Sequence, residues 1–450
     1  MLALELAVML AVCGTPALSP QDAAESPQDS TGELRKENAE LKKKFAELQE
    51  KVDRLNTKME LRETEPAPAA STPEAQMMFD GDNALLTALK EVRLSGFVDM
   101  GYVLSFNSLH TSSSASVAGG TANASGNPIR VFDTKGNSFY LNHVQLQLEK
   151  VATDKSIVGF RLKVDGGNDP NIFDGQPITF EEGYVEFLAP VGNGIDIKAG
   201  KMATLAGAEV IEARDDMNYS RGILFGFAIP FTHTGVRASY TFNDYVKTTL
   251  GFNNGWNLVP GPGTSNINTF IDSNHGKTVE TQLEVHPTKT LTLDATVYAG
   301  DENGFTTTGG NTAYASQYVF DFVANLSVGK ATFVGNFDWG AHENDLASGN
   351  RSEWSGVAGY VKYQFTDIVA TAIRAEYFSD GNGRIPPASA ILPTPARYVE
   401  ATLTEEFKVA GTAIIRIELR SDNSNKETFQ RDGKPARGDT TIGFEAILPF

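Results

Sequence analysis

From residue 92 to the end of the chain, apolar and polar side chains alternate in short segments. In residues 160–165, for example, Phe, Leu and Val alternate with Arg, Lys and Asp. Successive side chains of a β-strand point to opposite faces, so each such segment predicts a strand with one apolar and one charged face. About sixteen segments of this kind are expected, near residues 92–106, 138–151, 155–165, 179–189, 193–202, 231–242, 244–254, 277–286, 289–300, 317–328, 331–341, 353–365, 368–379, 397–408, 412–421 and 439–450.

The connections between these segments alternate between short and long. The short ones carry turn-forming residues, at Asn243–Asp244, Pro287–Thr288, Gly329–Lys330, Thr366–Asp367 and Ala410–Gly411. The long ones, rich in Gly, Asn, Ser and Pro, are expected near 107–137, 166–178, 203–230, 255–276, 301–316, 342–352, 380–396 and 422–438. This pattern is typical of barrels in outer membranes, where the apolar strand faces contact lipid and the charged faces line water. It predicts a closed antiparallel transmembrane β-barrel of about sixteen strands over residues 91–450.

The last expected strand alternates to the end of the given sequence. Its apolar positions are Ile442, Phe444, Ala446, Leu448 and Phe450. A terminal Phe on an alternating strand resembles the signal read by the bacterial outer-membrane assembly machinery. We therefore expect Phe450 to act as an assembly signal and that machinery to be a partner.

The first residues read as an export signal. An apolar stretch from Leu2 to Val12 is followed by small residues as far as Ala17, which predicts a signal peptide over residues 1–19. The only cysteine, Cys13, lies in this region, so lipidation there is the alternative. No later stretch approaches 18 uncharged apolar residues, as a transmembrane helix would need.

A heptad repeat predicts an α-helical coiled coil over residues 33–62, ahead of the barrel. Leucine occupies every d position, and one a position is polar, which is a device that fixes register and oligomer state. The expected core residues are Leu34, Asn38, Leu41, Phe45, Leu48, Val52, Leu55 and Met59. A single amphipathic helix packed on another surface is the alternative. Residues 63–90 form a Pro/Ala-rich linker and lead-in, too poor in apolar residues to build a core.

Charge and motifs exclude several functions. The chain has 56 acidic and 38 basic residues, so nucleic acid is not an expected partner. Its six histidines lack metal-ligand spacing, and no hydrolase elbow, phosphate loop or zinc-protease motif is present. No enzymatic activity, cofactor or metal site is expected. Residues 165–175, which include Asp165, Asn168, Asp169 and Asp174, are interpreted as a solvated turn rather than a calcium loop. Trp256, Trp339 and Trp354 are expected in interfacial girdles.

Several short motifs resemble the OmpL-like β-barrel porins of Gram-negative bacteria. They are Leu94–Asp99, Ile197–Met202, Gly207–Glu209, Asn218–Gly222 and Pro230–Gly235. The resemblance covers about residues 90–450. It implies passive or weakly selective transport of small solutes across the outer membrane, without naming a solute.

A sixteen-stranded barrel is too wide for side chains to fill, so a water-filled lumen is expected unless something plugs it. The long connection 203–230 is the best candidate for a pore constriction, with Glu209, Glu212, Arg214, Asp215, Asp216 and Arg221 as its charged residues. The alternative is that it lies on the outer surface in solvent. The expected pore-lining residues of the strands are Arg161, Lys163, Glu186, Lys198, Asp294, Arg374, Glu376, Arg416, Glu418 and Arg420.

The function predicted from these features is a porin for small hydrophilic solutes or ions, in contact with outer-membrane lipid. A homo-oligomer is expected through a coiled coil in the periplasm. The alternatives are a tethering barrel whose coiled coil is the functional part, and a soluble or surface β protein used in adhesion. Detergent-free extraction would identify the last of these, because its apolar strand faces would pack on each other.

Overall fold

The computed structural model describes residues 91–107, 129–133, 136–174, 177–255, 276–306, 312–343, 351–381, 395–432 and 434–450. The expected signal peptide, coiled coil and linker therefore all lie outside the described residues. In the described part of the chain, no helix is long and apolar enough to cross a membrane.

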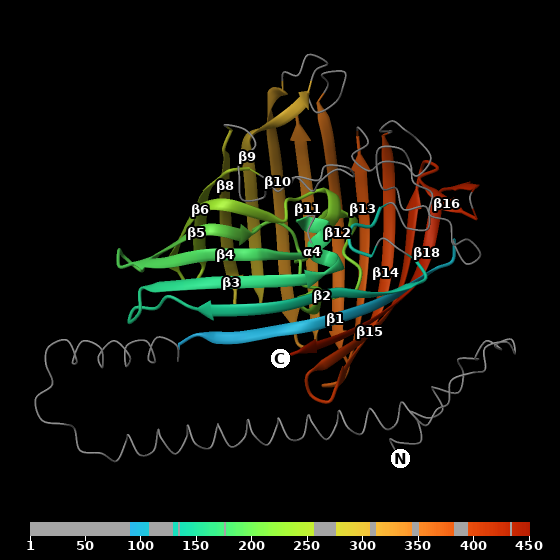
Figure 1. Ribbon diagram of the computed structural model, residues 1–450, viewed down its shortest axis with the longest axis horizontal. Coiled ribbons are helices and arrows are strands. Elements are labelled where there is room, and N and C mark those ends of the chain that lie inside the picture. The colour runs from blue at the N-terminus through green and yellow to red at the C-terminus, as the bar shows by residue number, and fades with distance from the viewer. Residues whose placement is uncertain are drawn as a thin grey trace, which may run out of the picture. The chain divides into compact units, whose positions relative to one another are not determined.

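Sixteen strands form one closed antiparallel sheet in which each strand pairs with its neighbours in the chain. The strands are β1 (Arg93–Ser105), β2 (Ser138–Lys150), β3 (Val158–Gly167), β4 (Ile178–Ala189), β5 (Ile195–Ala203), β6 (Thr232–Asn243), β7 (Val246–Asn253), β8 (Thr278–Thr288), β9 (Leu291–Thr306), β10 (Thr312–Val328), β11 (Ala331–His342), β12 (Ser352–Gln364), β13 (Val369–Asp380), β14 (Ala396–Val409), β15 (Ala413–Ser424) and β18 (Gly438–Pro449). Figure 1 shows β1–β4 crossing the view in front of the steeper β8–β14, as strand tilt in a closed barrel requires. The predicted barrel is confirmed.

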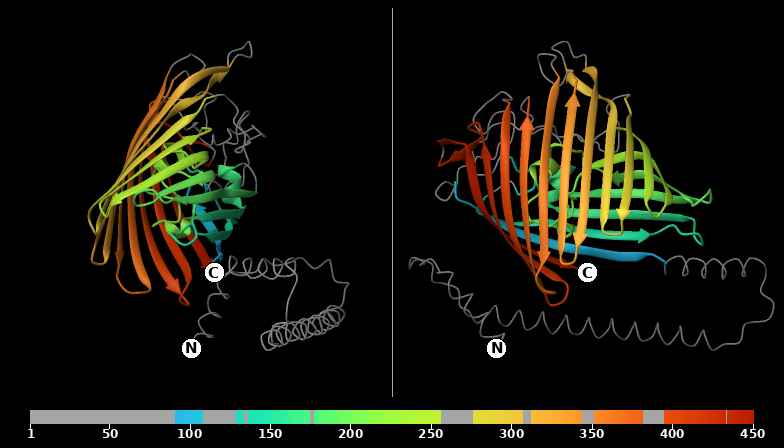
Figure 2. Two further views of the ribbon diagram at one scale, coloured as in Figure 1. Left: turned by 90° about the vertical axis from the view of Figure 1, so that its left-hand side faces the viewer. Right: turned by 180° about the vertical axis from the view of Figure 1, so that it is seen from behind.

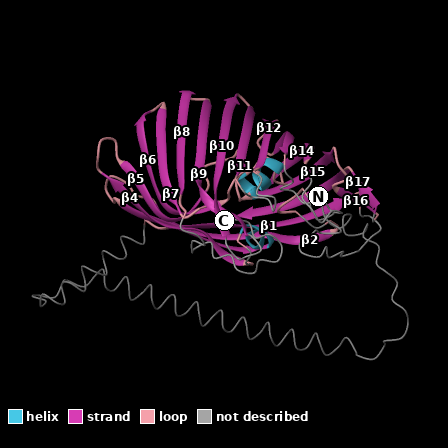
Figure 3. Ribbon diagram, turned by 90° about the horizontal axis from the view of Figure 1, so that it is seen from above, coloured by secondary structure: helices cyan, strands magenta, loops and turns pink. Residues whose placement is uncertain are grey.

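Few other elements are present in the described residues. A hairpin of β16 (Phe429–Arg431) and β17 (Lys434–Ala436) stands apart from the barrel. The helical segments are α4 (Asn168–Phe173), the 3₁₀ turn η1 (Ala213–Asp215) and α5 (Ile223–Phe227). Figure 3 shows the helices inside the curve of the strands.

The barrel closes between its first and last strands. Phe97 pairs with Pro449 and Ser105 with Thr441 across the β1–β18 seam. Phe450 continues this ladder, because its N–H and C=O each bond to the backbone of Gly96 at 3.0 Å. The terminal residue is therefore part of the closure, while its role as an assembly signal stays a prediction.

Alternation separates the two faces of the wall. In β13, for example, Ile373 and Tyr377 are 51% and 41% exposed, whereas Arg374 is 0% exposed. The right-hand view of Figure 2 shows the strands of this part of the wall side by side. Their exposed positions are largely apolar, which places the apolar face on the outside. A charged group on a lipid-facing position near mid-membrane costs about 2–4 kcal/mol, which is why the alternating pattern determines the strand orientation.

One predicted turn is wrong. Pro287–Thr288 belongs to β8, and the connection to β9 is Lys289–Thr290. Pro287 has no N–H to donate, and the β8–β9 register is irregular between Val285 and Thr288. At Ala410 and Gly411, by contrast, φ is 50° and 85°, the left-handed conformation that the predicted turn requires.

Candidate functional site: the barrel interior

The connection between β5 and β6, residues 204–231, is called the inner loop here because it lies against the inner wall of the barrel. Its N–H of Leu205 donates to Tyr298 Oη in β9 at 2.9 Å, and its Ala228 C=O accepts from Trp354 in β12 at 3.0 Å. Further contacts reach β3, β11, β13 and β15. Of the two placements that the sequence left open, the structure has the inward one.

Two wall carboxylates hold the loop by its backbone. Glu418 in β15 accepts the N–H of Tyr219 at 2.8 Å and that of Ser220 at 3.2 Å. Glu376 in β13 accepts the N–H of Ile223 at 2.6 Å, at the start of α5, which has no side-chain cap of its own. The first N–H groups of a helix need such acceptors, so the wall completes the helix.

Guanidinium groups of the wall bind the carbonyl groups of the loop. Arg416 donates to the C=O of Ala213 at 2.7 Å and of Asp216 at 2.8 Å, and Arg420 donates to the C=O of Arg221 at 2.7 Å. Arg416 also pairs with Glu445 at 3.0 Å. These cations are buried, and their pairing with carboxylates and carbonyls makes that burial tolerable.

An apolar cluster lies inside the barrel. Leu224, Phe225 and Phe231 of the inner loop pack in one cluster with Trp354 and Phe378 of the wall. Trp354 is 1% exposed, so its expected place in an interfacial girdle is wrong. Its indole faces inward and binds the loop, while Trp256 lies outside the described residues. The sequence did not predict this cluster, because strand alternation predicted that the inward faces of the wall would be polar.

A second segment, residues 168–174, also lies inside. Asp169 in α4 pairs with Arg221 of the inner loop at 3.0 Å, and Asp174 pairs with Lys201 at 2.5 Å. Both carboxylates are buried. The interpretation of this segment as a solvated turn is therefore wrong, because its charges are neutralised by partners distant in the sequence.

The six constriction candidates fall into two groups. Four are buried in ion pairs or hydrogen bonds within the barrel: Glu209, Glu212, Asp216 and Arg221. Arg214 and Asp215 face water, with side chains 22% and 57% exposed and 3.2 Å apart. The Arg214 guanidinium lies 4.7 Å from the ring centre of Phe97, near the start of β1. Only these two candidates are placed to meet a solute.

The pKa values of two loop carboxylates are shifted in opposite directions. Burial raises the pKa of Glu212, but the Lys163 ammonium outweighs it and holds that pKa at about 2. Burial and the neighbouring Glu209 raise the pKa of Asp216 well above its usual value, against the opposing charge of Arg221. Burial also raises the pKa of Tyr219.

The ten predicted pore-lining residues of the strands differ in how deeply they are buried. Arg374, Glu376, Arg416, Glu418 and Arg420 are fully buried against the inner loop, and Lys163 is bound to its Glu212. The other four are half-buried and lie towards the short turns. Together with similar neighbours they form a set called the vestibule here: Glu149, Arg161, Glu186, Asp196, Lys198, Lys247, Glu284, Asp294 and Lys362.

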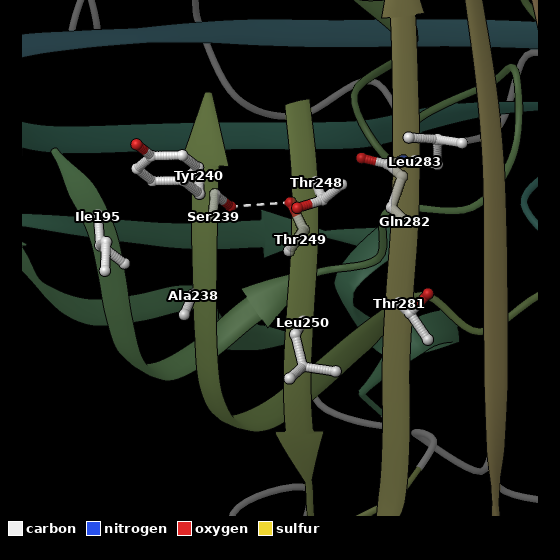
Figure 4. Close-up of a pocket in the computed structure, with 10 residues that line it drawn as sticks. All are labelled: Ile195, Ala238, Ser239, Tyr240, Thr248, Thr249, Leu250, Thr281, Gln282 and Leu283. Atoms are coloured by element: carbon white, nitrogen blue, oxygen red, sulfur yellow. Dashed lines mark hydrogen bonds between the residues drawn. The ribbon is translucent and has the colours of Figure 1, made fainter. Parts of the chain in front are cut away.

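A hollow of about 510 Å³ lies in the wall at β5–β8 (Figure 4). Leu250 and Leu283 line it and are exposed on the outer face, while Ser239 and Thr249 share a hydrogen bond of 2.8 Å. It is part of the wall and is separate from the vestibule.

One cluster could hold a metal ion: His143, Asp165 and Glu181, on β2, β3 and β4. No sequence motif marks this cluster, because its residues are 16 or more positions apart. The cluster depends on β-bulges in β2 and β4, and no rule based on sequence spacing predicts such bulges.

A closed sixteen-stranded barrel with an apolar outer face, a charged inner face and a long inward connection defines a channel-type barrel of the outer membrane. The family model described as "Putative beta-barrel porin-2, OmpL-like" matches residues 91–450. The chain belongs to this family of outer-membrane porins, and the resemblance seen in its motifs is confirmed.

Solved structures show the same fold. The loop L8 deletion mutant of OmpT, an outer membrane protein of Vibrio cholerae, is 12% identical with a TM-score of 0.50, covering 80% of this chain and 99% of its own. Salmonella typhi OmpF is 10% identical with a TM-score of 0.50, covering 80% and 97%. Comparison with curated protein sequences gave no match.

Proposed function

We propose that this porin lets small hydrophilic solutes and ions diffuse passively through the barrel, past the inner loop. The observation that carries the proposal is the unequal filling of the lumen. The inner loop occupies one part of the interior, whereas the vestibule side chains and the Arg214–Asp215 pair stay in contact with water. Charged groups at the edge of a narrow aqueous path select among ions at close range.

A weak preference for cations follows from the pairing of these charges. Each cation of the vestibule lies within 4 Å of a carboxylate, in the pairs Arg161–Glu149, Lys198–Glu186, Lys247–Glu284 and Lys362–Glu406. Asp294 has no ion pair among the described residues. The vestibule therefore offers passing ions more free negative than positive charge.

The proposed role is transport without catalysis, which the membership in a porin family supports. The test is single-channel conductance of detergent-purified full-length protein in a planar bilayer, with the reversal potential measured in a salt gradient. Folding is checked by heat modifiability, the shift of a folded barrel on an unheated gel. Stable conductance steps support the proposal, and closed bilayers from folded protein contradict it.

Two matched variants assign selectivity to the Arg214–Asp215 pair. We expect Arg214→Gln to shift the reversal potential towards cations and Asp215→Asn to shift it towards anions. Arg351→Gln is the control, because it removes the same charge from a side chain that stacks over the outward Trp339 ring. Equal shifts from Arg214→Gln and Arg351→Gln would show that only net charge matters.

We further propose that the protein is exported by its first 19 residues, with Cys13 lipidation as the alternative, and inserted by the barrel assembly machinery. The heptad repeat of residues 33–62 is proposed to join copies of the chain in the periplasm. Deleting residues 33–62 tests this with crosslinking and conductance. Loss of crosslinked oligomers with unchanged conductance supports it. Loss of envelope integrity without any conductance in either form supports the tethering role.

A further inference from the structure

Two β-bulges aim extra polar side chains into the barrel beside the inner loop. In β2 the pairing passes from His143 to Leu141, which leaves Asn142 as the extra residue, and Asn142 and His143 are both buried. In β4 the pairing passes from Glu182 to Phe180, which leaves Glu181 as the extra residue, and Glu181 and Glu182 are both buried. A bulge often re-aims a side chain at a functional site.

These bulges bring His143 and Glu181 to Asp165, which lies on β3 between them. One donor atom from each of the three side chains can be chosen so that all lie within 4.8 Å of one another. The His143 Nε2 atom is 3.1 Å from Asp165 Oδ1. All three side chains are 0% exposed.

Two of the three side chains, His143 and Asp165, have unused hydrogen-bonding capacity, whereas Glu181 accepts from Lys163 at 3.1 Å and from Gln145 at 3.4 Å. Neither ring nitrogen of His143 and neither oxygen of Asp165 has a hydrogen-bond partner among the described residues, since the 3.1 Å approach lacks hydrogen-bond geometry. The Phe97 ring packs edge-on against the imidazole at 4.9 Å and fixes its orientation. A fully buried, oriented imidazole with two unpaired nitrogens is accounted for by a bound water or ion.

The charges around the cluster favour a cation. Asp165, Glu181, Glu182 and Glu212 are grouped around the single ammonium of Lys163, which lies 3.1 Å from Glu181 and 3.0 Å from Glu182 and also binds Glu212. Arg161 reaches only Glu182 among these, at 3.3 Å. Buried carboxylates in excess of their cationic partners are stabilised by a bound metal ion.

We propose that His143, Asp165 and Glu181 bind one divalent first-row transition-metal ion, such as Zn²⁺, on the inner wall of β2–β4. One imidazole nitrogen and two carboxylate oxygens suit Zn²⁺ and Mn²⁺. A tetrahedral ion with bonds of about 2.1 Å places its ligand atoms about 3.4 Å apart. On binding, the three ligand atoms would therefore move towards one another by roughly an ångström. Three protein ligands leave a fourth position for water.

The test is metal binding to untagged, full-length, detergent-folded protein. The protein is freed of metal with a chelator and incubated with Zn²⁺, Mn²⁺ or Mg²⁺, both during refolding and after it, because buried ligands exchange ions slowly. Bound metal is counted by elemental analysis, and affinity is measured by calorimetry. We expect one Zn²⁺ per chain, weaker Mn²⁺ binding and no saturable Mg²⁺ binding.

Variants locate the ion. Asp165→Asn and Glu181→Gln preserve shape and should each weaken Zn²⁺ binding at least tenfold, and Lys163→Gln should strengthen it by removing a competing cation. His286→Asn is the matched control, because His286 and Glu284 form a His–carboxylate pair at 2.7 Å that lacks a third ligand. Heat modifiability shows that each variant is folded.

Two results would overturn the proposal. One is the absence of saturable Zn²⁺ binding below millimolar concentration in folded wild-type protein. The other is binding that survives Asp165→Asn and Glu181→Gln but is lost in His286→Asn. Neither result bears on conductance, so the porin proposal stands or fails separately.

Discussion

Buried charged side chains in this barrel act mainly as anchors for the backbone of the inner loop. Glu376 and Glu418 accept N–H groups of the loop, and Arg416 and Arg420 donate to its carbonyls. The sequence predicted which of these residues face inward, since alternation alone decides that. It could not predict their partners, because those lie on a loop without periodicity, and only burial distinguishes an anchor from a pore-lining charge.

Removing one anchor tests this role. In Glu418→Ala the N–H groups of Tyr219 and Ser220 lose their acceptor, at about 1–3 kcal/mol for each buried donor left unpaired. We expect a looser inner loop, with a larger and noisier single-channel conductance and a lower temperature of heat modification. Glu284→Ala removes a carboxylate whose ion pairs among the described residues are with Lys247 and His286, and it should leave that temperature nearly unchanged.

The pH response should depend on Asp216. Its pKa is raised by burial and by Glu209, so its neutral form favours the docked loop. That contribution is complete below the ordinary carboxyl pKa and is lost as pH rises through the raised value. Glu212 acts oppositely: with a pKa of about 2, its stabilisation persists above the ordinary value and is lost only as pH falls through about 2.

Mild acid should therefore tighten the loop through Asp216 while Glu212 remains charged. We expect Asp216→Asn, which is uncharged at every pH, to reduce the change of conductance between pH 7 and pH 5. An unchanged pH profile in this variant would assign the response to other groups.

At the scale of elements, most of the sixteen strands were predicted within a few residues, because period-two alternation and turn residues act locally. The expected long connection 301–316 is wrong, because β9 continues to Thr306 and β10 begins at Thr312. The two bulges and the inward Trp354 were missed, since each depends on which neighbour occupies the facing position. Gly340 in β11 is such a neighbour. It pairs with Trp354, and a Cβ at this position would come within 2.1 Å of the indole.

Gly340→Ala should therefore displace the indole and weaken its hydrogen bond to Ala228. Overpacking of this kind costs about 1–3 kcal/mol, which we expect as a lower temperature of heat modification and a noisier conductance. Gly335→Ala in the same strand is the control, because an added Cβ there meets nothing within 4 Å. Equal effects of the two substitutions would mean that strand propensity, and not the indole, is responsible.

At the scale of the whole molecule, we expect the barrel wall to fold independently of the inner loop. The wall closes through β1–β18 without help from the loop. Replacing residues 205–227 with a short Gly/Ser linker should leave a folded, heat-modifiable barrel whose conductance is several-fold larger, because the inner loop no longer fills its part of the sixteen-stranded lumen. An unchanged conductance would show that the loop does not limit the path.

The inner loop also sets an order of events during assembly. Some of its partners, such as Lys163 and Asp169, precede it in the chain. Others come far later: Glu376 follows Ile223 by 153 residues, and Arg420 follows Arg221 by 199. Contacts at such separation form slowly, because chain entropy is lost before they contribute. The inner loop cannot complete its contacts with the wall until β13 and β15 have formed. The lumen of the assembling barrel is therefore wider than that of the mature protein. The lumen of this channel therefore narrows during maturation, and the narrowing is complete only when the last strands have paired with the first.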